Sequence, residues 1–98
     1  MITTLIVPNV GNAEFNAGLH AQLCAKFGGF TAVQGQGGWK AENHVICEPV
    51  TVYTIATGDK SWSVLAFRAL AKEIARDLAQ ECVYLAFAPD LSAEFIKP

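Results

Sequence analysis

The stretch FGGFTAVQGQGGWKAENHVICEPVTVYTIA, residues 27–56, decides the fold of this chain. Residues 30–34 and 50–56 are rich in β-branched and aromatic side chains, which is typical of strands. Alternation along the second of these strands separates two sets of side chains, one on each face. One set is Val50, Val52 and Thr54, and the other is Thr51, Tyr53 and Ile55. The stretch predicts one long β-hairpin.

The segment between these two strands predicts a glycine-rich hairpin tip. Three of the four residues 35–38 are glycine, which permits positive φ or close backbone approach. Residues 39–40 and 45–46 can continue the ladder, with the chain turning over at 41–43. Pro49 lacks an N–H and cannot donate to a ladder, so it predicts a bulge or a sheet edge at its position.

Each flank of the hairpin adds a helix and a strand. Residues 2–7 (ITTLIV) and 82–87 (CVYLAF) have strand composition. Asn12 is a good N-cap for a helix that ends at Gly28-Gly29, and residues 61–80 carry a second apolar helical stripe. The order β-α-β-β-α-β predicts an α+β, ferredoxin-like domain, in which a four-stranded antiparallel sheet carries both helices on one face. We expect residues 1–98 to form this single domain, with 89–98 as a short C-terminal tail.

Composition limits the function classes. The 98 residues are 52% apolar and only 16% charged, with a net charge of −2. A small domain cannot bury that much apolar surface in one core, so an open sheet face and a homo-oligomer are expected. The acidic balance argues against nucleic-acid binding. Three scattered cysteines, the absence of a basic leader and the absence of a long apolar run predict a cytoplasmic protein without a membrane segment.

A pattern of residues along the chain resembles a group of short, uncharacterised bacterial and phage proteins. That group shows a G-hydrophobic-T strand, a G-x-G-x-W turn, an acidic residue before a V-x-V-Y-like strand, and a closing Q-E-x-V strand. The matching positions span most of the chain. They are Gly29, Thr31, Gly35, Gly37, Trp39, Glu48, Val50, Gln80, Glu81 and Val83. The resemblance implies a phage or mobile-element origin and implies no particular activity.

The candidate binding residues lie in and beside the hairpin. They are Gln36, Trp39, Lys40, His44, Glu48 and Tyr53. The glycine-rich segment is not a phosphate-binding motif and opens no helix, so turn geometry explains it better than ligand contact. Trp39 is either packed on the sheet or used as an interface anchor. Glu48 is a general base in a cleft, a partner of backbone N–H groups, or simply solvated.

No catalytic or metal site follows from the spacing. His44 and Cys47 are three apart, which places them on opposite faces of a strand and argues against a shared metal or a Cys-His pair. The row Arg68, Lys72 and Arg76 lies beside Glu73 and Asp77, which favours a solvated helix face over the alternative of an RNA or phosphate surface. We therefore predict no cofactor.

Three functions remain open from the sequence. The first is a non-enzymatic, homodimeric binding protein that contacts a protein or small ligand through the glycine-tryptophan tip and the open sheet face. The second is a small cofactor-free enzyme of the dimeric ferredoxin-like barrel type, in which Trp39, His44 and Tyr53 line an apolar cavity. The third is an antagonist of a host defence system, which only the phage resemblance suggests. The first is preferred, and enzymatic activity is not expected.

Overall fold

The computed structural model describes residues 1–58, 60–88 and 94–98, which form five strands and two helices. In chain order these are β1 (Ile2–Pro8), α1 (Ala13–Phe27), β2 (Thr31–Ala41), β3 (His44–Ala56), α2 (Lys60–Asp77), β4 (Val83–Ala88) and β5 (Glu94–Ile96). The first six elements follow the predicted order.

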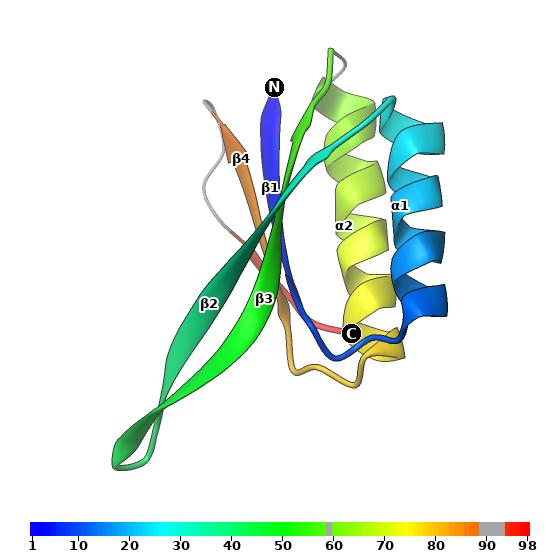
Figure 1. Cartoon of the computed structure of the whole chain (residues 1–98). Helices are drawn as coiled ribbons and strands as arrows, with labels where there is room; N and C mark the ends of the chain where they lie inside the picture. Colours follow the sequence, from blue (N-terminus) through cyan, green and yellow to red (C-terminus); the bar gives the residue numbers. More distant parts are fainter. Residues whose placement is uncertain (59, 89–93) are drawn as a thin grey trace.

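All five strands form one antiparallel sheet in the order β2-β3-β1-β4-β5, and both helices cover the same face of it (Figure 1). The predicted four-stranded ferredoxin-like layout is wrong, because β5 adds a fifth strand beyond β4. Its three residues give no periodic signal of their own. They become a strand only because they pair with the exposed edge of β4.

The predicted tail at 89–98 is therefore wrong at residues 94–96; residues 89–93 lie outside the described residues. Strand β5 is held to the second helix as well as to the sheet. Arg68 in α2 donates through Nε and an NH2 group to the two carboxylate oxygens of Glu94, at 2.9 and 2.8 Å. A planar guanidinium matches a carboxylate in this two-bond arrangement. One member of the predicted basic helix face is thus engaged within the protein.

The hairpin of β2 and β3 continues as an unbroken ladder far beyond the rest of the sheet (Figure 1). Pairing runs from Thr31 opposite Thr54 to Ala41 opposite His44, and Glu42 and Asn43 alone make the turn. The predicted bulge at Pro49 is wrong. Its alternative, an edge, is confirmed, because β1 pairs with β3 only as far as Pro8 opposite Val50. The glycines lie within extended β2 rather than at the tip.

Helix α1 begins and ends at its predicted caps. The Asn12 side chain accepts a hydrogen bond from the Phe15 N–H at 2.8 Å, and Gly28 ends the helix with φ of 90°. Only glycine adopts that φ without strain. These two caps fix where α1 lies against the sheet.

The core lies between the helices and the sheet. Phe67 of α2 is fully buried, stacked on Phe27 at a centroid distance of 4.0 Å and edge-on to Phe87 at 6.4 Å. The buried apolar side chains come from both layers: from β1, β3 and β4 of the sheet, and from α1 and α2. The largest are Leu5, Leu23, Ile55, Phe67, Leu70, Ile74, Leu85 and Phe87.

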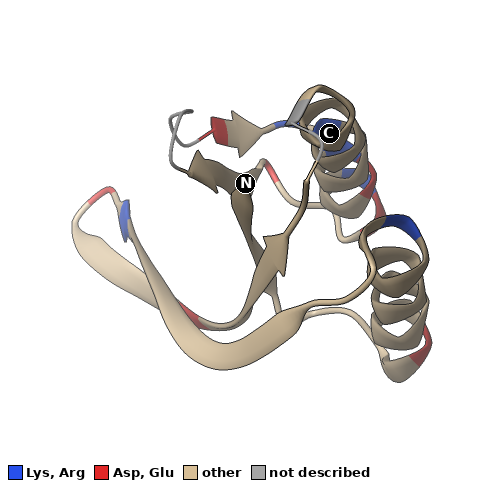
Figure 2. Ribbon diagram, turned by 90° about the horizontal axis from the view of Figure 1, so that it is seen from above, with Lys and Arg blue, Asp and Glu red and all other residues tan. Residues whose placement is uncertain are grey.

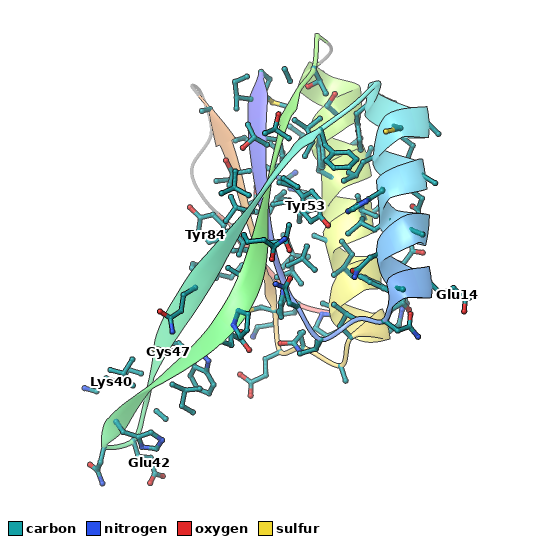
Figure 3. All side chains as sticks on the ribbon, in the orientation of Figure 1. Glu14, Lys40, Glu42, Cys47, Tyr53 and Tyr84 are labelled. Atoms are coloured by element: carbon teal, nitrogen blue, oxygen red, sulfur yellow. The ribbon has the colours of Figure 1, made fainter. Side chains whose placement is uncertain are left out.

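The other sheet face carries no helix. Alternation places Tyr53 on the helix side, where it is 2% exposed, and Tyr84 on the uncovered side (Figure 3). Of the two sets predicted for β3, the one containing Thr51, Tyr53 and Ile55 is buried under the helices. Val52 and Thr54 face outward. We call the uncovered side the open face.

Candidate functional site

A groove of about 500 Å³ lies on the open face. The sheet curves so that the hairpin rises on one side of this face and the β4–β5 edge on the other (Figure 2). The lining residues come from β1, the hairpin, the turn after α2, β4 and β5. They are Ile6, Pro8, Gly37, Gly38, Trp39, Glu48, Val50, Ala79, Gln80, Glu81, Cys82, Tyr84 and Phe95.

The hairpin side of the groove depends on glycine. Gly37 lies directly opposite Glu48 in the ladder, and a Cβ on Gly37 would come within 3.1 Å of a Val50 methyl group. Glycine at this position therefore avoids crowding Val50, which lines the groove. Trp39 follows two residues later on the same face and is 53% exposed. The side contributes an exposed indole and a carboxylate to the groove.

The opposite side is aromatic. Tyr84 of β4 and Phe95 of β5 are paired across the strands, and their rings meet edge to face at 5.5 Å and 76°. Phe95 is 67% exposed, so this ring pair presents a large apolar surface to the groove. This side therefore supplies the groove with aromatic surface and one phenol group.

The turn after α2 closes one end of the groove. Ala79 takes φ of 53°, and the Gln80 N–H donates to the Ala75 carbonyl at 2.8 Å, which ends the helix in a left-handed turn. That turn brings Gln80 and Glu81 to the groove. A second carboxylate and an amide thus join the site from an element distant in sequence from the hairpin.

The predicted binding residues separate into two groups. Trp39 and Glu48 line the groove, whereas Gln36, Lys40 and His44 are exposed elsewhere on the hairpin. Tyr53 lies under α1 on the helix-covered face (Figure 3). The barrel-type enzyme would require Trp39, His44 and Tyr53 to line one cavity between the sheet and the helices. The structure does not bring these three residues together.

Tyr53 has a structural environment. Its hydroxyl lies 2.9 Å from Nε2 of His20, and its ring meets those of His20 and Phe30 edge-on at 5.6 and 5.5 Å. Burial raises the pKa of Tyr53 above 10.0. These contacts join α1 to the base of the hairpin.

Sequence reasoning missed the far side of the groove as a site. Gln80 and Glu81 appear in the pattern shared with bacterial and phage proteins, and Tyr84 alternates outward on the last strand. Those two signals could have indicated them. Phe95 had no such signal, because its position depends on the unpredicted pairing of β5.

A second hollow of about 480 Å³ runs between the two helices on the other side of the molecule. Its floor is formed by core residues such as Leu19, Leu70 and Ile74, and its rim carries Glu14, Glu73 and Asp77. The acidic side chains lie at the rim, and the floor is part of the filled core.

Within the described residues, no cluster of three or more His, Cys, Asp and Glu side chains is placed to hold a metal ion. Neither described helix is long and apolar enough to cross a membrane.

The architecture is a five-stranded antiparallel sheet covered on one face by two helices, with a long hairpin beside a groove on the other. Among solved structures it is similar to a phage SAM lyase in complex with S-methyl-5'-thioadenosine. The match has a TM-score of 0.69 and 14% sequence identity, and covers 96% of this chain and 88% of that chain. At this identity the match shows a shared fold.

No protein-family model and no curated protein matches the sequence. The resemblance to the bacterial and phage group therefore stays a prediction.

Proposed function

We propose that this protein binds S-adenosylmethionine in the groove on the open face and cleaves it to S-methyl-5'-thioadenosine. The observation that carries the proposal is the groove itself, on a fold shared with a phage SAM lyase. At about 500 Å³ it falls in the range of pockets that hold small ligands. It combines aromatic surface with a few polar groups, as such pockets do.

The groove offers a partner for each chemical part of this ligand. Adenine is a flat aromatic ring, and Trp39, Tyr84 and Phe95 provide ring surfaces on both sides of the groove. The amino-acid end carries an ammonium group, and Glu48 and Glu81 provide carboxylates. The Gln80 amide can donate to the ligand carboxylate or ribose.

The cleavage requires no cofactor. Breaking the bond between sulfur and the γ-carbon leaves both electrons on sulfur, which becomes the neutral thioether of S-methyl-5'-thioadenosine. In one route the ligand's own carboxylate oxygen bonds to the γ-carbon, which gives a lactone. In the other route the β-carbon loses a proton and forms a double bond to the γ-carbon, which gives an alkene. A groove carboxylate would hold the ammonium group in the first route and accept the proton in the second.

Incubation with S-adenosylmethionine tests this proposal directly. Chromatography with mass detection should show S-methyl-5'-thioadenosine forming in proportion to protein concentration, together with a four-carbon amino-acid product. The Glu48→Gln variant should lower the rate by about 100-fold or more if its carboxylate takes part in the step. The matched Glu14→Gln variant changes an exposed carboxylate on α1, outside the groove, and should cleave at the parent rate. Intact S-adenosylmethionine after prolonged incubation would contradict the proposal.

Such an activity would make the protein an antagonist of host defence. A host system that depends on S-adenosylmethionine would lose its cofactor while the protein is expressed. Expression in a bacterium should lower the cellular S-adenosylmethionine pool and reduce protection against phage, and the Glu48→Gln variant should do neither. A loss of protection with an unchanged pool would instead favour direct binding of a host protein, which capture from lysate through the hairpin would reveal.

We also propose that the protein forms a homo-oligomer. Val33, Val45 and Phe95 are each at least 60% exposed on the hairpin or the open face, which is a large apolar surface for a small protein. A second copy packed against the hairpin would cover it. Light scattering at micromolar concentration should give a multiple of 10.5 kDa. A Val45→Lys variant should shift the distribution toward the monomer, and a strictly monomeric parent protein would contradict this part.

A further inference from the structure

We infer that the groove selects for positive charge at the centre of its ligand, so that it binds a sulfonium more tightly than the corresponding neutral thioether. This inference rests on the proposed function and adds the property by which substrate and product are told apart. It follows from the charges, the partners and the ring surfaces of the groove.

The charged side chains of the groove are all acidic. Among the described lining residues, Glu48 and Glu81 are carboxylates and none is Lys, Arg or His. The basic residue nearest in sequence to Trp39 is Lys40, which alternation places on the other face of β2. Arg68 of α2 is engaged with Glu94. The local field in the groove therefore favours a cation.

No residue that the structure describes compensates the two carboxylates. Within the described residues neither Glu48 nor Glu81 makes an ion pair or a side-chain hydrogen bond. Glu48 is half-buried, and its cross-strand neighbour is Gly37, which has no side chain to offer it. A bound cation would supply the missing partner at little cost in existing contacts.

The aromatic rings of the groove also favour a cation over a neutral ligand. Trp39 and the Tyr84–Phe95 pair lie on the two sides of the groove. The negative faces of aromatic rings attract cations, most strongly those that water solvates weakly, such as quaternary ammonium groups. A sulfonium has the same character, because its charge is spread over alkyl groups. A neutral thioether keeps the dispersion contacts and loses the electrostatic attraction.

The functional consequence is product release. Cleavage converts the cation into a neutral thioether within the site, so the interaction that held the substrate disappears as the bond breaks. The groove would then bind the product, S-methyl-5'-thioadenosine, more weakly than the substrate, S-adenosylmethionine.

Two stable ligands isolate the charge from the rest of the molecule. Sinefungin carries an amine, protonated at neutral pH, in place of the sulfonium, and S-adenosylhomocysteine carries a neutral sulfur; both keep the adenosine and the amino-acid end. Calorimetric titration should show sinefungin binding about tenfold or more tightly than S-adenosylhomocysteine. This ratio should fall as salt is raised from low to about 1 M, because salt screens the charge term.

The variants assign the selectivity to the two carboxylates. Glu48→Gln and Glu81→Gln should each reduce the affinity ratio, and the double variant should bring it close to one. Affinity for S-adenosylhomocysteine should fall less than affinity for sinefungin, because S-adenosylhomocysteine shares the ammonium group but lacks the central charge. Residual binding of S-adenosylhomocysteine also shows that the variants are folded. Glu14→Gln should leave the ratio unchanged.

The outcomes separate this inference from the proposed function. Equal affinities for the two ligands in the parent protein would overturn the selectivity and leave the proposed binding site intact. An unchanged ratio in the double variant would overturn the role of the two carboxylates. Binding of neither ligand would overturn the proposed function, and the inference with it.

Discussion

The two faces of the sheet use similar residues for different purposes. On the helix side, Leu5, Ile55 and Phe87 are at most 2% exposed, and they pack into a filled core. On the open face, Val33 and Phe95 are at least 60% exposed, and Phe95 lines a groove. Apolar side chains alternate onto both faces of the same strands, so composition alone does not distinguish a core from a binding surface.

Glycine and charge distinguish the two faces. The helix side is closed by large side chains from α1 and α2. The open face has Gly37 where a side chain would crowd Val50, and among the described residues its Glu48 has no internal partner. The comparison predicts that changes on the helix side affect stability and that changes on the open face affect binding.

The largest expected effect is on the helix side. Phe67→Ala removes a fully buried ring that stacks on Phe27 at 4.0 Å. The free energy of unfolding should fall by about 3–5 kcal/mol, measured by chemical denaturation. Val33→Ala truncates a 60% exposed side chain on the open face and should cost under about 1 kcal/mol. Similar losses for the two variants would contradict the distinction between the faces.

The two tryptophans offer a matched pair for binding. Trp39 on the hairpin and Trp62 on α2 are 53% and 50% exposed, but only Trp39 lines the groove. Trp39→Ala should weaken sinefungin binding by about tenfold or more, since the indole provides both ring surface and cation attraction. Trp62→Ala should leave the affinity unchanged, as calorimetry would show. Loss of binding in both variants would indicate that the groove is not the site.

The sequence predicts what local chemistry determines. The caps at Asn12 and Gly28, the two helices and the long hairpin all follow from residue types at short spacing. Strand β5 and its Phe95 do not, because three residues acquire a strand conformation only from pairing with β4. The sequence also left open which face of β3 is covered, since both alternating sets are largely apolar.

The site was predictable in part for the same reason. Trp39 and Glu48 are unusual residues within one hairpin, so they were identified from the sequence. Glu81 and Tyr84 lie more than thirty residues further along the chain. They join the groove because β1 pairs with β3 on one edge and with β4 on the other, so that β4 and the turn before it reach the same open face as the hairpin. Such a meeting depends on tertiary topology rather than local pattern.

A smaller effect is expected for a polar cluster at the base of the hairpin. The Thr51 hydroxyl donates to Asn9 Oδ1 at 2.6 Å and accepts from Gln34 Nε2 at 3.0 Å; Asn9 in turn donates to Gln34 at 2.7 Å. Thr51→Val keeps the shape and removes the two bonds of the hydroxyl, so the free energy of unfolding should fall by about 1 kcal/mol. Thr54→Val, at an exposed open-face position, should change it by less than about 0.5 kcal/mol. Equal effects would mean that the cluster contributes nothing.

The smallest effect is a pH dependence confined to the helix side. Burial raises the pKa of Tyr53 above its ordinary value of 10.0. Above pH 10 the unfolded chain loses this proton while the folded protein keeps it, so the stability that is fully present below pH 10 declines as pH rises further. Tyr53→Phe should remove part of this decline in denaturation curves recorded between pH 8 and pH 11. Tyr84→Phe, on the open face, should retain it, and identical curves for Tyr53→Phe and the parent protein would contradict the assignment.

The central claim is that the open face, rather than the helix side, binds the ligand. Titration of isotope-labelled protein with sinefungin, followed by NMR, tests it most directly. We predict that the largest shift changes fall on the Trp39 indole N–H and on the amides of Glu48, Glu81 and Tyr84. Changes concentrated instead at Phe15 and Leu70, in the hollow between the helices, or no changes at all, would contradict the claim.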